Sequence, residues 1–410
     1  MVVGSVSPVS DPAFNPFGAE FTRNPYPSYK RLREIAPVHS VRGCLGTDWV
    51  LSRYEDIRRI LTDPSCLVDD LPARIRRTAR DAAEVQALCD FVERWLFFVN
   101  PPSHTHLRET IGPHFSRAAI SGLEPTIRRL TEDLLSPKLR VGRIDLVLDV
   151  AQLLPCQVAA SLLGVPFIDT RQIVEWSVDL FAIFVQPASP AHYRRLNQQT
   201  ERFRQYLVTH WNQSRSEPGL ITSFVSKTNE GTIDVDQALA FCMMLFSVGQ
   251  ETTQHLMGNG MLALLDHPVQ MDRVRHGISL VNIKELARFN TPVQMIMRRA
   301  GSDMIIRGNT IRAGERLHLL LGSAHHDEDV FQAPEELDLS RTEASGLLFG
   351  TGPHVCLGLH VALLTAQIAI NAMVEALHNL RPANRERHWI RSSHMRGLAS
   401  LPCYFDSTPI

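Results

Sequence analysis

The sequence lacks closely spaced pairs of cysteines, and it has almost no excess of either charge. Its seven cysteines are scattered along 410 residues, and the formal net charge is −1. An odd number of scattered cysteines argues against a disulfide framework and for a reducing compartment. The balanced charge argues against nucleic-acid binding and against attraction to a membrane surface.

The sequence also shows no signal peptide and no uninterrupted apolar run near the roughly 20 residues that span a bilayer. We therefore expect a cytoplasmic protein without a membrane anchor. Residues 1–20 are rich in Pro, Ser and Gly, so we expect a flexible arm there and a single folded domain over residues 21–410. With 44% hydrophobic residues, such a domain can bury a large core.

Helical patterns dominate the chain, and strand patterns are few. Two short strand patterns near residues 38–43 and 48–53 are followed by a helical pattern at 54–63. More short strands are expected after residue 298 and near the carboxyl end. The pattern predicts a mainly α fold with a small β-rich part.

A glycine-rich stretch, FGTGPHVCLG at 349–358, holds a lone cysteine, Cys356. An apolar run without glycine follows and predicts a helix. The sulfur would then lie at the start of a helix, where unpaired N–H groups and the helix dipole favour a thiolate. Gly350 and Gly352 allow the loop to turn tightly. A thiolate presented in this way is a suitable axial ligand for a haem iron.

Three other interpretations of Cys356 fit the stretch alone. A single cysteine is often a small buried hydrophobic residue. His354, Cys356 and His360 would supply three zinc ligands, although the loop offers no fourth. Cys356 would also serve as a nucleophile with a distant histidine.

A second stretch, at 236–265, is too long and too apolar for a surface helix. Glu251, Thr252 and Thr253 follow Gly249 at its centre. Such polar residues suit a locally opened helix, in which Thr252 donates a hydrogen bond and Glu251 connects to a supply of protons. A kink stabilised by threonine, with a purely structural role, fits the same residues.

Two charged pairs complete the pattern. His104 and Arg108 lie four residues apart on one face of a predicted helix and suit a pair of carboxylates. Glu285 and Arg288 lie one helical turn apart. Either pair would also be compatible with an ordinary helix surface, where such pairs contribute little.

Taken together and in this order, the four elements resemble those of the cytochrome P450 family, the haem-thiolate monooxygenases. The resemblance implies the mostly helical fold of that family, with haem between the long central helix and the cysteine loop. One departure stands out. The family's AGxETT is VGQETT here, so Val248 replaces a small residue and is expected to crowd the space above the iron.

The resemblance also implies roles for individual residues. Cys356 would be the axial iron ligand, and Glu251 and Thr252 would deliver protons. Glu285 and Arg288 would stabilise the fold near the cysteine loop, and Arg299 is the neighbouring alternative to Arg298 in haem binding. The residues expected to bind haem are His104, Arg108, Arg298, Phe349, Gly350, His354 and Gly358.

The expected substrate is a mostly apolar small molecule, free or bound to a carrier protein, from bacterial secondary metabolism. The expected pocket residues are Trp95, Phe97, Phe98, Phe181, Met244, Val248, Val293, Ile296 and Leu398. Haem b and O₂ would be required, with NAD(P)H electrons arriving through a ferredoxin and its reductase, because no flavin or iron–sulfur motif is visible. The alternative is a haem-binding sensor or carrier without turnover.

Overall fold

The computed structural model describes residues 15–16, 18–43, 46–166, 170–184, 189–213, 219–342 and 346–407. Most of the predicted amino-terminal arm lies outside these residues. The predicted boundary between arm and domain falls within the first helix, α1 (Ala19–Arg23), which buries Phe21.

The α-helices account for most of the chain. In chain order they are α1 (Ala19–Arg23), α2 (Tyr26–Ile35), α3 (Tyr54–Thr62), α4 (Leu71–Thr78), α5 (Gln86–Val92), α6 (Ser103–Ile111), α7 (Arg117–Ser121), α8 (Glu124–Leu135), α9 (Leu154–Leu163), α10 (Thr170–Phe181), α11 (Pro190–Gln213), α12 (Leu220–Asn229), α13 (Val235–Asp266), α14 (Pro268–Arg273), α15 (Leu280–Phe289), α16 (Leu321–Ala324) and α17 (Leu359–Ala376). Shorter helical turns are η1 (Ala82–Val85), η2 (Gly112–Phe115), η3 (Leu146–Ala151), η5 (Ala182–Phe184) and η6 (Gly352–His354).

The strands are short and form three sheets. They are β1 (Val38–Gly43), β2 (Gly46–Leu51), β3 (Cys66–Val68), β4 (Arg143–Asp145), β5 (Ile296–Ala300), β6 (Met304–Ile306), β7 (Asn309–Ile311), β8 (Arg316–Leu319), β9 (Arg381–Pro382) and β10 (Pro402–Tyr404). The largest sheet has the order β1-β2-β8-β5-β3, in which only β2 and β8 are parallel. The smaller sheets are β4-β10-β9 and β6-β7.

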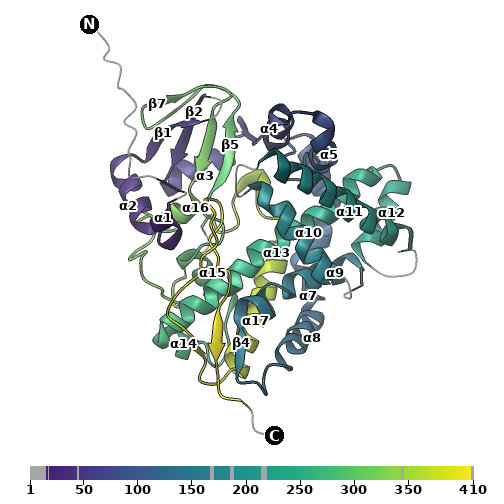
Figure 1. Ribbon diagram of the computed structural model, residues 1–410. Helices are drawn as coiled ribbons and strands as arrows, with labels where there is room; N and C mark the ends of the chain where they lie inside the picture. Colours follow the sequence, from purple (N-terminus) through teal and green to yellow (C-terminus); the bar gives the residue numbers. More distant parts are fainter. Residues whose placement is uncertain are drawn as a thin grey trace.

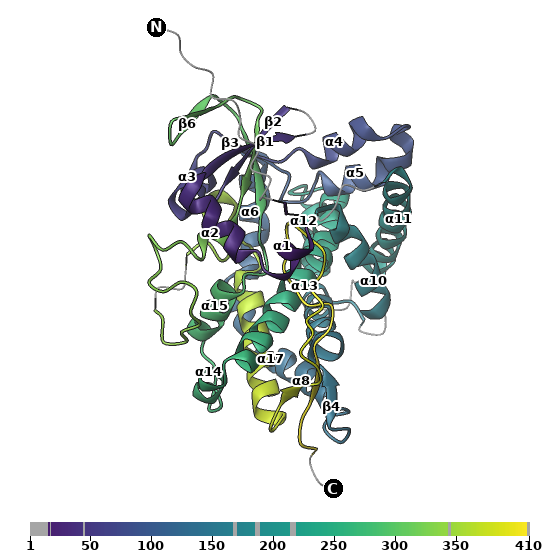
Figure 2. The same cartoon turned by 60° about the vertical axis from the view of Figure 1, so that its left-hand side comes forward.

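Two regions lie on either side of the central helix α13 (Figures 1 and 2). The largest sheet and helices α1–α3 form one region, and helices α4, α5 and α10–α12 form the other. The predicted mainly α fold with a small β-rich part is therefore confirmed.

Helix α13 contributes to two separate apolar clusters. Its first half, up to Phe246, packs in one cluster, and the second half, from Leu256, packs in the other. The stretch between them is polar, although it is mostly buried. The helix thus places polar side chains at the point where the apolar core is divided.

Glu285 and Arg288 of α15 are both completely buried. Arg288 donates two hydrogen bonds to the Glu285 carboxylate, at 2.7 and 2.8 Å, and others to the carbonyl oxygens of His325, Pro334 and Glu336. The pair therefore fixes the segment that leads to the cysteine loop. The N–H groups of Arg288 thus have several acceptors within the protein, whereas those of an arginine in an exposed ion pair do not.

Two helical stretches, Leu146–Leu163 and Leu359–Ala376, are long and apolar enough to cross a membrane by length and composition alone. In the fold, 61% of the first and 39% of the second are buried. The second is α17, which packs against α8, α13 and α15. Both stretches therefore pack against other parts of the fold, the first more completely than the second, and the absence of a membrane anchor remains a prediction.

Candidate active site

The cysteine loop turns where its glycines allow it. Gly350 and Gly352 both have φ of +72°, in the left-handed region that glycine adopts without strain. A Cβ at Gly352 would also collide with the backbone oxygen of Leu61 in α3. The N–H of Cys356 donates to the carbonyl of Phe349 at 2.8 Å, which closes the loop. Gly358 is the last residue before α17.

The sulfur of Cys356 is accessible although it lies deep among protein atoms. The residue has exposed surface, yet burial raises the pKa of its thiol. The backbone N–H groups of Gly358 and Leu359, and the charge of Arg108, act in the opposite direction. The start of the helix therefore favours the thiolate, as predicted. The effect of burial on the pKa of the thiol is larger and has the opposite sign.

Four basic or hydrogen-bonding side chains from distant parts of the chain converge near this loop. The ring of His104 in α6 lies against that of His354, with centroids 3.9 Å apart and the ring planes tilted by 36°. Burial, followed by the charges of Arg298 and of His104 and Arg108, lowers the pKa of His354 to about 3. Burial also lowers the pKa of His104, as do Arg108 and Arg298. These mutual effects place all four groups within electrostatic reach of one another.

Neither Arg108 nor Arg298 makes an ion pair in the described part of the chain. The pKa of Arg298 is lowered to about 10, mainly by burial, although the charge of Asp69 acts in the opposite direction. Its guanidinium donates a hydrogen bond to the carbonyl of Met297. His104 Nε2 is buried without a hydrogen-bond partner among the described residues. Buried donors without partners are costly, so the cluster is suited to an anionic ligand.

Arg299, the predicted alternative to Arg298, lies next to it in β5. Its charge acts on Asp70, and its Nε is buried with no hydrogen-bond partner in the part of the chain that the structure describes. Arg298 alone of the two acts on His104 and His354. The alternation of side chains along a strand explains the difference.

The centre of α13 holds the predicted acid and alcohol. Thr252 Oγ1 donates to the carbonyl of Val248 at 3.1 Å, and Thr253 Oγ1 donates to that of Gly249 at 2.9 Å. The helix runs without interruption from Val235 to Asp266. The predicted local opening is thus wrong, because the hydroxyls bond to the preceding turn while the helix stays intact.

Glu251 has a neighbour that the sequence analysis missed. His255, one turn further along α13, places Nε2 3.1 Å from Glu251 Oε2. A Cβ at Gly397 would collide with the His255 ring. The i, i+4 spacing of Glu251 and His255 was a usable signal, whereas the contact with Gly397 depends on the tertiary fold.

The aromatic residues of the predicted substrate pocket gather around Phe184, which lies in the span from residue 181 to 185 that was expected to border the pocket. Its ring lies 5.3 to 6.1 Å from each of four others. These are Trp95, Phe97, Phe98 and Phe181. Trp95 has no exposed surface, whereas Phe97 is 46% exposed. The carbonyl of Leu96 acts on His354, so this segment borders the basic cluster.

The other predicted pocket residues lie in several elements. Met244 is buried in the first apolar cluster, and Val248 packs half-buried at its margin, as does Val361 after the cysteine. Val293 pairs with Met395 outside any strand. The family resemblance also implies a strand over residues 293–296. This expectation is wrong, since β5 begins only at Ile296. Leu398 is buried in the second apolar cluster.

The donor set fits haem better than zinc. Among the described residues, no three His, Cys, Asp or Glu side chains come together in a way that would hold a metal ion. A flat group with two carboxylates and one open axial position on iron would instead match the basic cluster and the accessible sulfur. Cys356 would hold the iron, and Arg108, Arg298, His104 and His354 would hold the carboxylates.

Comparisons with known proteins agree with this geometry. The family model described as Cytochrome P450 matches residues 169–387. A vitamin D(3) 25-hydroxylase of Pseudonocardia autotrophica is 32% identical over 398 residues, covering 94% of this chain and 95% of the relative. The polyketide biosynthesis cytochrome P450 PksS of Bacillus subtilis is 28% identical over 401 residues, covering 95% and 98%.

A solved structure gives the same result for the fold. The structure of P450BioI in complex with an acyl carrier protein ligated to hexadec-9Z-enoic acid superposes with a TM-score of 0.86 at 28% identity. It covers 94% of this chain and 99% of that one. Because the family model matches more than half of the chain and the hydroxylase is similar over almost all of it, this chain belongs to the cytochrome P450 family of haem-dependent monooxygenases.

Proposed function

We propose that this monooxygenase oxidises a mostly apolar small molecule of bacterial secondary metabolism, held between the centre of α13 and the aromatic residues around Phe184. The observation that supports the proposal most strongly is the basic cluster beside Cys356, whose arginines make no ion pair among the described residues. Haem bound there would supply the activation of O₂ with externally delivered electrons.

The chain's own residues would then have separate roles. Cys356 would give its sulfur to the iron after loss of the thiol proton, because a metal-bound thiol is deprotonated. Arg108 and Arg298 would pair with the carboxylates, and His104 and His354 would donate hydrogen bonds to them. Phe349, Gly350 and Gly358 would shape the loop that presents the sulfur.

Glu251 and Thr252 would deliver protons to the site of oxygen activation. Thr252 would hold a hydrogen bond to the oxygen-binding space, after its hydroxyl turns away from Val248. Glu251 would supply protons to the same space, because a carboxyl group can be reprotonated from a neighbour between turnovers. Each turnover that releases one oxygen atom as water consumes two protons and two electrons.

The electrons would come from NAD(P)H through a ferredoxin and a ferredoxin reductase. The proposal follows from the sequence, which shows no flavin or iron–sulfur motif of its own. Proteins of this family generally use separate redox partners. That the partner of this chain is a ferredoxin is our proposal.

The names of two relatives suggest two sources of substrate. One relative hydroxylates vitamin D(3), and another acts in polyketide biosynthesis. The substrate of this chain would be comparably apolar, since aromatic and aliphatic residues border the proposed pocket. A fatty-acyl chain on a carrier protein, as in the P450BioI complex, is the carrier-bound form to test.

A basic stretch, RIRRTAR at 74–80, does not add a free surface for an acidic carrier. Arg74 pairs with Asp69 at 2.6 Å, and Arg77 pairs with Asp70 at 3.0 Å. Arg76 binds Asp90 and Glu93. Because these three arginines are already paired, we propose a free small molecule as the first substrate class to screen. We propose the cytoplasm as its location, since the two apolar helical stretches pack against other helices of the same fold.

The test combines two spectra. The reduced protein with carbon monoxide should show the red-shifted band of a thiolate-bound haem, and Cys356→Ser should lose it, whereas Cys66→Ser should keep it. A band that persists in Cys356→Ser would remove Cys356 as the ligand. A library of apolar compounds should then be screened for the low-to-high-spin shift of the Soret band. NAD(P)H-dependent product from a hit establishes turnover, and its absence with every hit would favour a sensor.

A further inference from the structure

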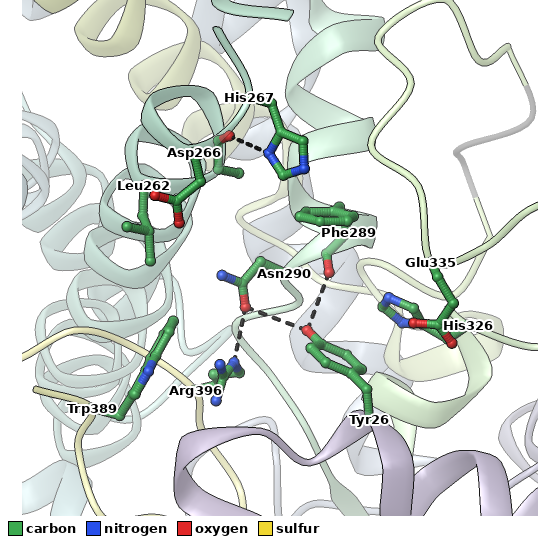
Figure 3. A pocket seen from close by; sticks show the side chains of 11 residues that line it. Tyr26, Leu262, Asp266, His267, Phe289, Asn290, His326, Glu335, Trp389 and Arg396 are labelled. Atoms are coloured by element: carbon green, nitrogen blue, oxygen red, sulfur yellow. Dashed lines mark hydrogen bonds between the residues drawn. The ribbon is translucent and has the colours of Figure 1, made fainter. Parts of the chain in front are cut away.

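A pocket of about 240 Å³ lies between the end of α13, the end of α15 and the carboxyl-terminal segment (Figure 3). Asp266 and Glu335 belong to its lining and are exposed, so the pocket reaches the protein surface. Asn290 and Arg396 form part of its inner lining and are buried. The mechanism described above does not use this pocket.

One ridge of α13 leads from the pocket to the acid of the proposed active site. Glu251, His255, Asn259 and Ala263 follow one another at intervals of four residues, and Ala263 lines the pocket. Residues four apart on a helix are neighbours on one inclined ridge. All four are buried, so the first three form a polar row inside the protein.

Asn259 connects the inner lining of the pocket to this row. Its Nδ2 donates to the carbonyl oxygens of Asn290 and Arg396, at 3.1 and 2.9 Å. Both residues line the pocket. Its Oδ1 is buried and accepts no hydrogen bond from the described residues. The side-chain amide of Asn259 is therefore fixed by two hydrogen bonds, while its Oδ1 can still accept one.

His255 occupies the next position, toward Glu251. Its side chain is 2% exposed, and Nε2 lies 3.1 Å from Glu251 Oε2 without the alignment of a hydrogen bond. Neither ring nitrogen has a hydrogen-bond partner among the described residues. Buried polar atoms without partners are rare and are commonly satisfied by ordered water. Asn259 Oδ1 and the His255 ring nitrogens lie on successive turns of α13. They could therefore form hydrogen bonds to a row of water molecules.

We propose, building on the roles of Glu251 and Thr252 proposed above, that His255 and Asn259 relay protons from this pocket to Glu251. A water held by Asn259 Oδ1 would give a proton to one nitrogen of the His255 ring. The ring would then release the proton on its other nitrogen to Glu251 Oε2, and a ring flip or tautomer exchange would restore it. The proton lost by the water is replaced from the solvent-filled pocket. His255 acts through Glu251 and is a positioning residue.

The first experiment measures access of water to His255 independently of catalysis. In the haem-loaded protein, exchange of the imidazole C2 hydrogen for deuterium is followed residue by residue by mass spectrometry. Ala263→Phe, which fills the pocket, and Asp266→Trp, which covers its edge, should slow exchange at His255 several-fold and leave His104 unchanged. If both variants retain the carbon monoxide band and exchange at His255 keeps its rate, the pocket is not the entrance and the proposal fails.

The second experiment measures proton delivery. His255→Phe keeps a ring against Gly397 but cannot carry a proton, so the fraction of NAD(P)H electrons recovered in product should fall roughly tenfold. His255→Gln, which keeps hydrogen bonding, should recover part of this loss. Gln254→Leu removes a neighbouring buried polar group and should have no effect. Equal losses in His255→Phe and Gln254→Leu, or no loss in His255→Phe, would overturn the relay.

The two proposals can fail separately. If Thr252→Ala leaves product recovery unchanged, the roles of the acid and alcohol are wrong, whatever happens at His255. If Thr252→Ala lowers product recovery while every His255 variant behaves like the wild type, only the relay is wrong.

Discussion

The rings of His104 and His354 lie in contact with centroids 3.9 Å apart, although one belongs to α6 and the other to the turn η6 just before Cys356. The contact joins the amino-terminal half of the chain to the cysteine loop. Arg298 reaches the same point from the largest sheet. The basic cluster is therefore complete only when three distant parts of the chain have assembled.

Arg298→Gln is expected to weaken haem binding more than Arg299→Gln. The guanidinium of Arg298 is buried without a carboxylate partner, and hydrogen bonds to charged groups contribute about 1.5 to 3 kcal/mol. Loss of haem to an excess of apomyoglobin should become roughly 10 to 100 times faster. Arg299→Gln, on the opposite side of β5, is the control. Equal rates for the two variants would show that Arg298 does not hold a haem carboxylate.

Thr252→Ala should divert electrons from product to peroxide. Without the hydroxyl, the proposed hydrogen bond to the oxygen-binding space is lost, while the helix keeps its backbone bonds. The ratio of product to NAD(P)H consumed should fall several-fold, with a matching rise in hydrogen peroxide. Thr253→Ala removes the adjacent hydroxyl, which bonds to Gly249, and should keep the wild-type ratio. The same ratio in both variants would contradict the role of Thr252.

Val248→Ala should admit bulkier ligands. Val248 is half-buried at the margin of an apolar cluster that also contains Met244 and Val361, and removal of two methyl groups opens space there. Binding spectra of a series of substituted imidazoles should show the largest gain in affinity for the bulkiest members. Val225→Ala, at the margin of the same cluster but in α12, is the control. An unchanged series in Val248→Ala would indicate that this side chain does not limit the space.

Glu285→Gln should destabilise the protein strongly. Removal of one charge leaves Arg288 buried and unpaired, which typically costs about 3 to 5 kcal/mol. The free energy of unfolding in urea should fall by this amount, or the protein should fail to accumulate. Glu124→Gln breaks an exposed helix pair with Arg128 and should cost at most about 0.5 kcal/mol. A similar small loss in Glu285→Gln would show that the buried pair is dispensable.

His325 should make the fold sensitive to acid. Burial, followed by the charge of Arg288, lowers its pKa to about 3, whereas an exposed histidine titrates near 6.5. Below pH 6.5 the unfolded chain therefore binds a proton that the folded chain rejects. The free energy of unfolding should fall as the pH drops from 6.5 toward 3, by about 2 kcal/mol at pH 5 from this residue alone.

The check compares urea unfolding at neutral pH and at pH 5 for the wild type and His325→Gln. The difference between the two pH values should shrink in the variant, which can still bond to Thr291 as the ring does. Burial also lowers the pKa of His394, to about 4, so part of the dependence will remain. The exposed His276→Gln should leave the difference unchanged, and an unchanged difference in His325→Gln would refute the assignment.

Local sequence patterns were sufficient for the cysteine loop and for the helix that follows it. The glycines at 350 and 352 have the predicted backbone conformation, and the helix after Cys356 begins at Leu359. These features depend on near neighbours in sequence. Glu285 and Arg288 of α15 also pair with each other, as their spacing predicts. Their interaction is strong because later segments of the chain bury the pair.

Features that depend on distant contacts could not be predicted. The sequence indicated an opened helix near Gly249, but α13 stays regular, with its threonine hydroxyls bonded to the preceding turn. Phe184 joins four aromatic rings that come from two separate segments. The contact of His255 with Gly397 is set by the path of the carboxyl-terminal segment, which no helix pattern reveals.

The close approach of Gly397 to His255 has a practical consequence for engineering. Libraries that aim to alter substrate preference will naturally include the turn around Leu398. Position 397 should be left out of them, because any larger residue would displace the imidazole and shift Glu251 with it. Variants selected there for a new substrate would then lose electrons to peroxide.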